Sequence, residues 1–507
     1  IVDHDKSKAA VLEFRAHNTN ELILVPGFNS TDENGEITTL GRGGSDYTAS
    51  LLANYIKASA LEIWTDVSGM FTAHPNLVAQ AMPIPRLSYE EAMELSHFGA
   101  KVIYPPTLQP LIENEIPILI KNTFDAAAAG TQIDKSGTSE GGNGTVVKGV
   151  SHIEKVALIN LEGSGMIGIP GFSKRLFECL SLKQINIIMI TQASSEHSIC
   201  IGVRMEDADE AKKAIDTQFE FEISLSRVEP AKVETHMTNI AVVGDHMKKH
   251  QGISGKLFSS LGANNINIKA TAQVASERNI SIIIDERNTQ KALNTIHESF
   301  FETQTKELNL FITGVGNVGG KLLEQINQQA AYLLENLRLK IQVIALSNSR
   351  KMVLSDAPLD LNDWESKLEE NKVKADRIAF FEHIKKLNLR NSIFVDNTAN
   401  EEIAKEYNNF LKHNIGVVTC NKIACASTLN NYKELKKTAR RYGTPFLFET
   451  NVGAGLPVID TLNNLIASGD EIQKIQAILS GSLNFVFNNF NTQTSFESVV
   501  KSAQDEG

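Results

Sequence analysis

Residues 308–320 read LNLFITGVGNVGG and decide the fold of the second half of the chain. Leu308–Thr313 is an apolar run typical of a buried strand, and a long helical pattern follows the glycines. A Gly-x-Gly-x-x-Gly motif between a strand and a helix lets the backbone approach a pyrophosphate at the helix N-terminus. The motif therefore predicts a dinucleotide site, and a tight packing turn without a ligand is the alternative. The candidate cofactor residues are Gly314, Val315, Gly316, Asn317, Val318 and Gly319.

Three further apolar runs, at residues 341–347, 392–396 and 415–419, alternate with helical patterns and predict a doubly wound parallel sheet. An acidic residue at the end of the first of these runs would favour NAD. The chain instead has Ser347, Asn348, Ser349, Arg350 and Lys351 there. Hydroxyls and two cations suit a 2′-phosphate, so the sequence favours NADP, and a solvated basic turn is the alternative.

Two features after these strands are candidates for ligand binding. Lys422 follows a strand at the edge where parallel sheets bind ligands, although it could also be a surface lysine. We interpret Cys420 beside it as a small buried residue rather than a nucleophile, since no histidine follows nearby. Glu449 lies in the segment FLFETNVGAGLP, whose carboxylate and carbonyl groups would suit a cation. A simple glycine-rich loop is an equal alternative.

An internal repeat occupies the middle of the chain. Residues 185–203 read INIIMITQASSEHSICIGV, and residues 266–284 read INIKATAQVASERNISIII. Each copy predicts a strand, a glycine turn, a helix, a strand, a turn and a strand, which is half of a ferredoxin-like unit. Two copies indicate paired small α/β domains.

The first 128 residues alternate apolar runs with helical patterns, which predicts an α/β layer fold. We expect buried strands at residues 21–25, 61–65 and 116–120, a helix at 46–60, and a capping box at 88–91 that opens another helix. Residues 134–145 are rich in Gly, Ser and Thr and predict a flexible connector between domains.

A second glycine-rich loop, GRGGSD at residues 41–46, precedes the expected helix. Its backbone N–H groups can meet an anion, and Arg42 offers a fork for a carboxylate or phosphate, although a plain turn is equally compatible. Residues 64–69 (WTDVSG) and 99–102 (GAKV) add a carboxylate and a cation, which phosphoryl transfer uses. Neither a Walker A motif nor a protein-kinase signature is present.

The motifs GVGNVGG, VVTCNK, FETNVGAGLP and ILSGSLNF together resemble homoserine dehydrogenase. The resemblance implies that Gly314–Gly319, Thr398 and Lys422 contact NADP and that Lys422 also lies at the substrate as a catalytic candidate. It implies a monovalent cation, Na⁺ or K⁺, held by Glu449 and by the carbonyls of Val452, Ala454 and Leu456. The family continues with acidic substrate-binding residues and a catalytic lysine that have no counterpart before Gly507, so we expect a truncated domain.

The motifs GRGGSDYTA, IWTDVSGMFTAHP and MELSHFGAKVIYPPT resemble aspartokinase, of the amino-acid kinase fold. The resemblance implies that aspartate is held by Arg42, Gly43, Gly44 and Ser45, that Asp46 assists catalysis, and that ATP with Mg²⁺ is bound by Thr65, Asp66, Phe71, Lys101 and Val102. Two departures stand out: the family has Tyr at the position of Phe71 and Asp-Pro-Arg at residues 74–76. The family's K-F-G-G segment has no counterpart in residues 1–40, so we expect the kinase domain to lack its N-terminal part.

The repeated units resemble ACT domains, which bind small amino acids at the edges of paired sheets. The resemblance implies an effector site at the glycine turns Gly163–Gly168 and Gly244–Gly252, with side-chain amides from Gln192 and Gln273. The alternative is that both glutamines merely face solvent or the paired sheet. The domain order implies threonine as the effector, although the residue types alone do not separate it from lysine or methionine. ACT domains pair between chains, which implies a homo-oligomer, a dimer or tetramer.

Composition narrows the possible partners. The net charge is −11 without a basic block, which argues against nucleic acid and anionic membrane. No apolar run approaches the ~20 residues that span a bilayer, and the first residues do not read as a signal peptide. The four cysteines are scattered and form no metal or disulfide pattern. We therefore expect a cytoplasmic protein with small-molecule substrates: aspartate, aspartate semialdehyde and homoserine.

The sequence thus predicts an α/β multidomain member of the bifunctional aspartokinase–homoserine dehydrogenase family. The expected parts are an aspartokinase portion at 1–133, a linker at 134–150, ACT domains at 151–228 and 229–303, a Rossmann domain at 308–428 and the start of the dehydrogenase catalytic domain at 429–507. One rival is a non-catalytic amino-acid-sensing regulator derived from this family. A second is a monofunctional aspartokinase joined to an unrelated NADP-binding module.

Overall fold

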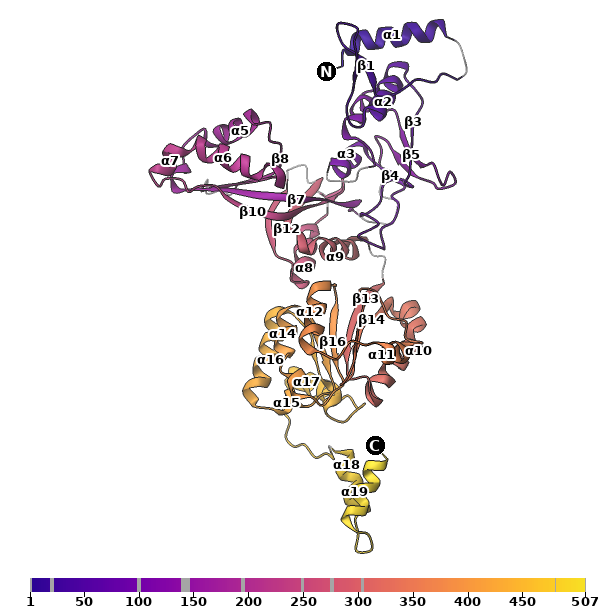
Figure 1. Ribbon diagram of the computed structural model, residues 1–507, viewed down its shortest axis with the longest axis vertical. Coiled ribbons are helices and arrows are strands. Elements are labelled where there is room, and N and C mark those ends of the chain that lie inside the picture. The colour runs from indigo at the N-terminus through magenta and orange to yellow at the C-terminus, as the bar shows by residue number, and fades with distance from the viewer. Residues whose placement is uncertain are drawn as a thin grey trace. The chain divides into compact units, whose positions relative to one another are not determined.

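The computed structural model describes residues 2–18, 22–97, 102–137, 146–192, 197–247, 250–273, 278–301, 305–478 and 480–506. The chain divides into two compact units, Ile1–Gln304 and Thr305–Gly507. Figure 1 labels their elements. Among the described residues, no helix combines the length and apolar character needed to cross a bilayer.

The front of the first unit is a mixed sheet flanked by helices. Its strands have the order β3-β5-β6-β4, with β3 and β5 parallel and β6 antiparallel to β5. Its elements are α1 (His4–His17), β1 (Asn29–Thr31), β2 (Ile37–Thr39), α2 (Gly44–Ile56), β3 (Leu61–Thr65), β4 (Arg86–Leu87), α3 (Tyr89–His97), α4 (Gln109–Ile112), β5 (Ile118–Asn122) and β6 (Thr131–Ile133). The capping box at the start of α3 is confirmed, because the Glu91 carboxylate accepts the Ser88 N–H and the Ser88 hydroxyl accepts the Glu91 N–H, both at 3.0 Å.

One expected strand in this part is wrong. The described residues of the segment 21–25 form no strand, and Leu22 and Leu24 are 88% and 95% exposed. An apolar run becomes a buried strand only where a neighbouring strand pairs with its backbone, and the described structure pairs none with this segment. The start of the expected connector is held in place, because the buried Asp134 carboxylate accepts hydrogen bonds from Arg86 and Ser136. Residues 138–145 of the connector lie outside the described residues.

The two repeats form one six-stranded antiparallel sheet with the order β11-β12-β10-β7-β9-β8. The first copy contains β7 (Gly149–Glu162), α5 (Phe172–Leu182), β8 (Ile187–Gln192), β9 (Ser198–Arg204), α6 (Ala208–Gln218) and α7 (Glu220–Ser224). The second contains β10 (Lys232–Val243), α8 (Ile253–Ala263), β11 (Ile268–Gln273), β12 (Asn279–Asp285) and α9 (Thr289–Phe301). The helices and strands of each copy therefore follow the predicted order, and α6 and α7 in the first copy and α9 in the second are added after the last predicted strand.

The two long central strands are shared between the copies. The first part of β7 pairs with the second part of β10, and Val150 is buried with Ile240, Leu257 and Leu261 in the core under α8 and α9. The second part of β7 pairs with β9, and its Ile159 is buried in the core under α5 and α6. Each small domain is thus completed by half of a strand from the other.

The second unit is a Rossmann sheet with the order β15-β14-β13-β16-β17-β18. All its strands are parallel except β15, which runs antiparallel to β14. Its elements are β13 (Lys306–Thr313), α10 (Asn317–Leu337), β14 (Leu339–Ser347), β15 (Met352–Leu354), α11 (Trp364–Glu370), α12 (Arg377–Leu387), β16 (Ser392–Asp396), α13 (Glu401–Ala404), α14 (Tyr407–Lys412), β17 (Gly416–Thr419), α15 (Ile423–Ala426), α16 (Leu429–Tyr442), β18 (Phe446–Leu447), α17 (Ile459–Ala467), α18 (Gly481–Asn489) and α19 (Phe496–Asp505).

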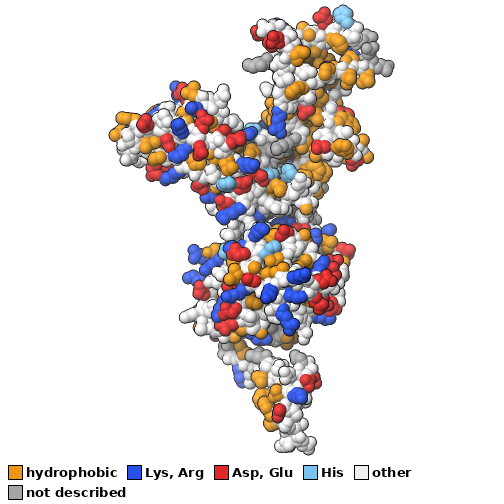
Figure 2. Space-filling model, in the orientation of Figure 1, with side chains coloured by type: hydrophobic (Ala, Val, Ile, Leu, Met, Phe, Trp, Pro, Cys, Tyr) orange, Lys and Arg blue, Asp and Glu red, His pale blue; other side chains and the backbone are white. Residues whose placement is uncertain are grey.

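Helices cover both faces of this sheet, as the prediction of a doubly wound sheet requires (Figure 1). One apolar core lies under α10 and α11, and the other under α12, α14 and α16. The strand order reverses between β13 and β16, so their carboxyl ends form the crevice where such sheets bind ligands. Figure 2 shows basic and acidic side chains intermingled on the visible face of this unit.

Candidate functional site

The glycine loop between β13 and α10 is shaped for close backbone approach. Gly314 has φ +85°, which favours glycine. A Cβ on Gly319 would lie 2.0 Å from the Gly314 carbonyl oxygen, whereas a Cβ on Gly316 would meet nothing within 4 Å. Gly316 therefore borders open space at the N-terminus of α10, where free N–H groups can bind an anion.

A buried amide group lies against this loop. Asn397 Nδ2 is buried and has no hydrogen-bond partner in the described structure, and a Cβ on Gly319 would lie 3.2 Å from it. Buried donors without acceptors are uncommon in proteins. This donor, the open space at Gly316 and the helix N-terminus together fit a pyrophosphate.

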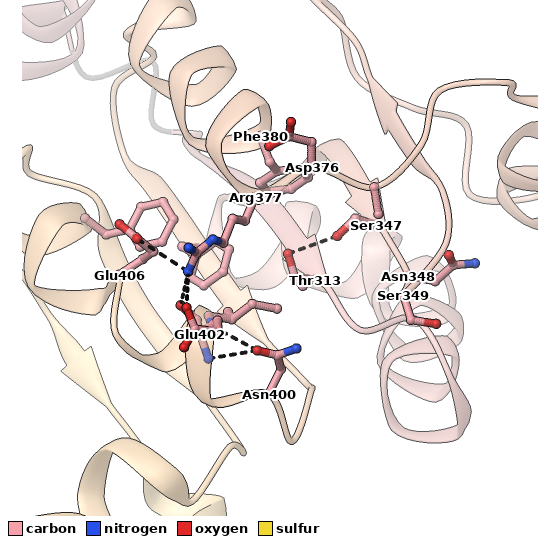
Figure 3. Close-up of a pocket in the computed structure, with 14 residues that line it drawn as sticks. Thr313, Ser347, Asn348, Ser349, Asp376, Arg377, Phe380, Asn400, Glu402 and Glu406 are labelled. Carbon is pink, nitrogen blue, oxygen red and sulfur yellow. Dashed lines mark hydrogen bonds and ion pairs between the residues drawn. The ribbon is translucent and has the colours of Figure 1, made fainter.

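A pocket of about 270 Å³ opens at the carboxyl ends of β13 and β14 (Figure 3). Apolar rings from Phe380, Phe394 and Phe410 contribute to its lining. Its rim carries Asn348 and Ser349 on one side and Arg377 on the other, where the Arg377 guanidinium pairs with Glu402 at 2.9 Å. An apolar pocket with a polar rim, beside a glycine loop, suits the adenosine half of a dinucleotide.

The turn after β14 presents the residues predicted to choose between NADP and NAD. The Asn348 side-chain oxygen accepts the N–H groups of Arg350 and Lys351, each at 2.7 Å, so Asn348 holds the turn. Ser349 and Arg350 are exposed. The Lys351 ammonium donates to the Glu369 carbonyl and is therefore already engaged.

Thr398 and Lys422 lie on neighbouring loops at the same edge of the sheet. Thr398 follows β16, and a Cβ on Gly314 would lie 2.8 Å from its methyl group, so this loop packs against the glycine loop. Lys422 follows the adjacent strand β17 and is exposed at the start of α15. Cys420 is partly buried, and burial raises the pKa of its thiol, which agrees with its interpretation as a packing residue.

Glu449 begins the predicted cation loop and caps a helix. Its two carboxylate oxygens accept the N–H groups of Ile459 and Asp460 at the start of α17, at 2.8 and 2.9 Å. The Leu456 carbonyl accepts the Val458 N–H at 2.9 Å, and Ala454 has φ +50°. Each of these oxygens keeps a further lone pair, so the arrangement fits a cation without requiring one.

The residues predicted for the kinase lie at one end of α2 and β3. Gly43, with φ +73°, caps α2, and Ser45 and Asp46 lie in its first turn. Burial raises the pKa of the half-buried Asp46 carboxyl. α2 contacts β3, and a short connection joins the end of α2 to the start of β3. The loop from Arg42 to Asp46, at the opposite end of α2, therefore lies toward the carboxyl end of β3.

The residues predicted to bind ATP follow β3 and α3. Thr65 ends β3, and its hydroxyl donates to the exposed Asp66 carboxylate at 3.1 Å. Phe71 is half-buried, and its backbone forms an isolated antiparallel β-bridge with Pro83. Val102 packs against the hydrophobic core of this part. Lys101 lies outside the described residues.

The two predicted effector glutamines occupy equivalent positions. Gln192 and Gln273 are the last residues of β8 and β11, and both are exposed. The Gln273 side-chain oxygen accepts the Ser254 hydroxyl at 3.3 Å, near the glycine turn that ends at Gly252. The first copy repeats this Gly-x-Ser pattern from Gly171 to Ser173, a signal that could have pointed to Ser254.

Sequence reasoning also missed Arg377 and Asp396. Arg377 is distant from the glycine loop in the sequence, and nothing local points to it. Asp396 ends a predicted strand at the ligand edge, and that position could have revealed it.

Family models match most of the chain. They are the amino acid kinase family at residues 2–122, the ACT domain at 159–219 and 240–300, the NAD-binding domain of homoserine dehydrogenase at 314–449 and homoserine dehydrogenase at 457–507. These matches define a class of protein that joins an amino acid kinase and a homoserine dehydrogenase through ACT domains.

Curated relatives and one solved structure narrow the class. A bifunctional aspartokinase/homoserine dehydrogenase of Haemophilus influenzae is 42% identical over 96% of this chain and 59% of its own length. A chloroplastic one of Arabidopsis thaliana is 37% identical over the whole chain and 56% of its own length. An aspartate kinase of Clostridium acetobutylicum matches 59% of this chain and 67% of its own with 27% identity and a TM-score of 0.52.

The chain belongs to the family of bifunctional aspartokinase/homoserine dehydrogenases. It spans a little over half the length of the curated relatives that it matches. The homoserine dehydrogenase match at 457–507 argues against an unrelated NADP-binding module.

Proposed function

We propose that the second unit binds NADPH and belongs to an enzyme that reduces L-aspartate 4-semialdehyde to L-homoserine. The crevice at the carboxyl ends of β13 and β16 carries this proposal, because it combines the glycine loop, the pocket and Lys422. The nicotinamide cofactor supplies the hydride when it is bound. The protein supplies the cradle for the pyrophosphate, and the Lys422 ammonium would polarise the aldehyde oxygen.

The preference for NADPH over NADH would come from Ser349 and Arg350. Both are exposed beside the pocket, and the turn carries no carboxylate for the ribose hydroxyls. Arg350→Ala should weaken NADPH binding at least ~10-fold and leave NADH binding nearly unchanged, because a charge-assisted contact to the 2′-phosphate is lost. Lys351→Ala is the matched control, since its ammonium is already engaged.

The test of the cofactor assignment is a fluorescence titration of the chain with NADPH and NADH, followed by homoserine-dependent reduction of NADP⁺. Binding of NADPH supports the proposal, and turnover extends it to catalysis by this chain. Binding without turnover leaves the cofactor assignment intact and favours the rival regulator unless a longer chain restores turnover. A folded chain that binds neither nucleotide would refute the assignment.

We further propose that the first unit belongs to a kinase that transfers phosphate from ATP, with Mg²⁺, to L-aspartate and gives 4-phospho-L-aspartate. Arg42, Gly43, Gly44 and Ser45 would hold aspartate, and Asp46 would assist the transfer. Thr65, Asp66, Phe71, Lys101 and Val102 would contact ATP. Asp46→Asn should abolish any aspartate-dependent ATP consumption without weakening the binding of ADP, since Asp46 lies at the aspartate loop.

The repeat pair would bind an amino-acid effector, for which we propose threonine. The equivalent positions of Gln192 and Gln273, and the Ser254–Gln273 hydrogen bond, support a site at each glycine turn. Calorimetric titration with threonine, lysine and methionine tests the choice of effector. Gln273→Ala should weaken binding, and stronger binding of lysine would exclude threonine.

Four further predictions complete the proposal. Glu449, Val452, Ala454 and Leu456 would hold Na⁺ or K⁺, which a cation-dependent thermal shift would reveal. The domain boundaries at 133, 150, 228, 303 and 428 and an assembly of two or four chains are also proposed. We place the protein in the cytoplasm, although the names of several relatives describe them as chloroplastic.

A further inference from the structure

Asp396 is a fully buried carboxylate at the end of β16 with three hydrogen-bond donors around it. It is 0% exposed. Its Oδ1 accepts the Thr398 N–H at 2.7 Å. Its Oδ2 accepts the Tyr407 hydroxyl at 2.6 Å and the Asn421 Nδ2 at 3.0 Å. Burial of a charged carboxylate is costly unless hydrogen-bond donors compensate for the lost water. The three donors must therefore keep their positions around Asp396.

The first of these bonds holds the loop that carries Thr398. The same loop is held at its start, where the Asn397 N–H donates to the Thr313 carbonyl at 2.9 Å. It continues to Asn400, whose N–H donates to the Thr398 hydroxyl at 3.1 Å and whose side chain caps α13. Because this loop packs on Gly314, the Asp396–Thr398 bond also sets the distance between Thr398 and the glycine loop.

The second bond holds the loop that carries Lys422. Asn421 is 2% exposed, and its Nδ2 donates both to Asp396 and to the Asn400 carbonyl, the latter at 3.1 Å. Its Oδ1 accepts the Ile423 N–H at 3.1 Å. The backbone is therefore held on both sides of Lys422, while the lysine side chain itself is exposed.

The third bond comes from the opposite side. Tyr407 lies on α14, outside both loops, and its hydroxyl also contacts Thr419 Oγ1 at 2.7 Å. Burial, with the nearby Asp396 carboxylate, raises the pKa of Tyr407, so the phenol keeps its proton and remains a donor to the carboxylate.

We propose that Asp396 is a positioning residue of the cofactor site, which sets Thr398 and Lys422 at a fixed separation beside the glycine loop. The inference rests on the proposed NADPH site. Asp396 is buried under the loops and acts through them rather than through contact with the cofactor. One carboxylate that bonds both loops couples their positions, so its loss should affect cofactor affinity beyond its effect on folding.

The test compares Asp396→Asn with Tyr407→Phe in the whole chain, by NADPH fluorescence titration and thermal unfolding. Asp396→Asn keeps the shape but sets its amide N–H₂ group against the Asn421 amide donor. It should raise the Kd for NADPH at least ~10-fold. Tyr407→Phe removes the bond from α14 to the same carboxylate and the contact with Thr419, but it leaves the bonds from Asp396 to Thr398 and to Asn421 in place. It should therefore lower the unfolding temperature comparably and change the Kd less than ~2-fold.

Rescue separates positioning from general damage. Asn421→Asp in the Asp396→Asn background restores a donor–acceptor pair between the loops and should recover part of the lost affinity. If Asp396→Asn does not fold, Asn421→Ala replaces it, since it releases only the Lys422 loop and should still raise the Kd several-fold.

Three outcomes would count against the proposal. Unchanged affinity in a folded Asp396→Asn or Asn421→Ala chain would overturn the inference alone. An equal loss of affinity in Tyr407→Phe and Asp396→Asn would assign Asp396 a purely structural role. Failure of the unaltered folded chain to bind NADPH would instead overturn the proposed cofactor site on which the inference rests.

Discussion

At the residue scale, two adjacent glycines of the cofactor loop have different roles. A Cβ on Gly319 would meet the Gly314 carbonyl oxygen at 2.0 Å, a backbone atom that has little freedom to move. A Cβ on Gly320 would meet only the Trp364 ring, at 3.7 and 3.9 Å, which is ordinary contact. Packing between the loop and its own helix therefore requires glycine at position 319, whereas position 320 can accept a side chain.

Gly319→Ala should destabilise the second unit by about 1–3 kcal/mol, because the loop must shift to admit the methyl group. It should also weaken NADPH binding, because the shift moves the free N–H groups at the start of α10. Gly320→Ala is the matched control and should stabilise the helix by roughly 0.5–1 kcal/mol. Chemical denaturation and NADPH titration measure both effects, and equal behaviour of the two variants would contradict this account.

The cysteines give a prediction of pH dependence. Burial raises the pKa of Cys200 and of Cys425 to about 11. Their thiols should therefore react slowly with a disulfide reagent at pH 8 in the native chain and rapidly in denaturant. The native thiols lose their protons at a higher pH than the thiols of the unfolded chain. The free energy of unfolding should therefore fall as the pH rises from about 9 to about 11. Alkaline unfolding of Cys200→Ser should show a smaller fall, and an unchanged profile would exclude this thiol as the cause.

At the element scale, the shared strands β7 and β10 explain why the repeat pair is one structure. The repeat pattern correctly predicted two similar copies, and it placed β7 in the first copy only. The structure divides β7, so that its first residues are buried with α8 and α9 and its later residues with α5 and α6. The exchange arises from the pairing of β7 with β10, which joins residues about 80 positions apart.

Val150→Ala should therefore reduce the hydrogen-exchange protection of α8 and α9 more than that of α5 and α6. Val150 is 2% exposed in the second core, and its truncation should cost roughly 1–3 kcal/mol. Ile159→Ala, only nine positions along the same strand, should show the reverse pattern. Loss of protection in α5 and α6 from Val150→Ala would mean that the strand is not divided.

At the scale of the whole molecule, the chain consists of two units with separate cores. We therefore expect two transitions in calorimetry. NADPH at 100 times its Kd should stabilise one of them by about 2.7 kcal/mol, because ligand binding to the native state shifts only the unfolding equilibrium of the unit that binds it. The transition that NADPH shifts should survive in a chain of residues 305–507. A single transition that NADPH shifts as a whole would show that the units unfold together.

The family, the fold classes of the parts and most of the strands could be predicted from the sequence alone, because these depend on local periodicity and on motifs contained within one segment. β3 and β16 have the predicted bounds, and the capping box forms as expected. The prediction of a strand at residues 21–25 was wrong because the burial of a strand depends on a pairing partner, which the local sequence pattern does not reveal.

Which distant residues contact one another could be seen only in the folded chain. Arg377 reaches the pocket beside the glycine loop from a helix about 60 residues after that loop, and Asp396 joins Thr398 to Asn421 across two strands. The division of β7 between two cores likewise depends on its pairing with β10. In each case the physical reason is the same: the sheet sets which chain segments become neighbours, and hydrogen bonds between such neighbours are not encoded in the pattern of either segment alone.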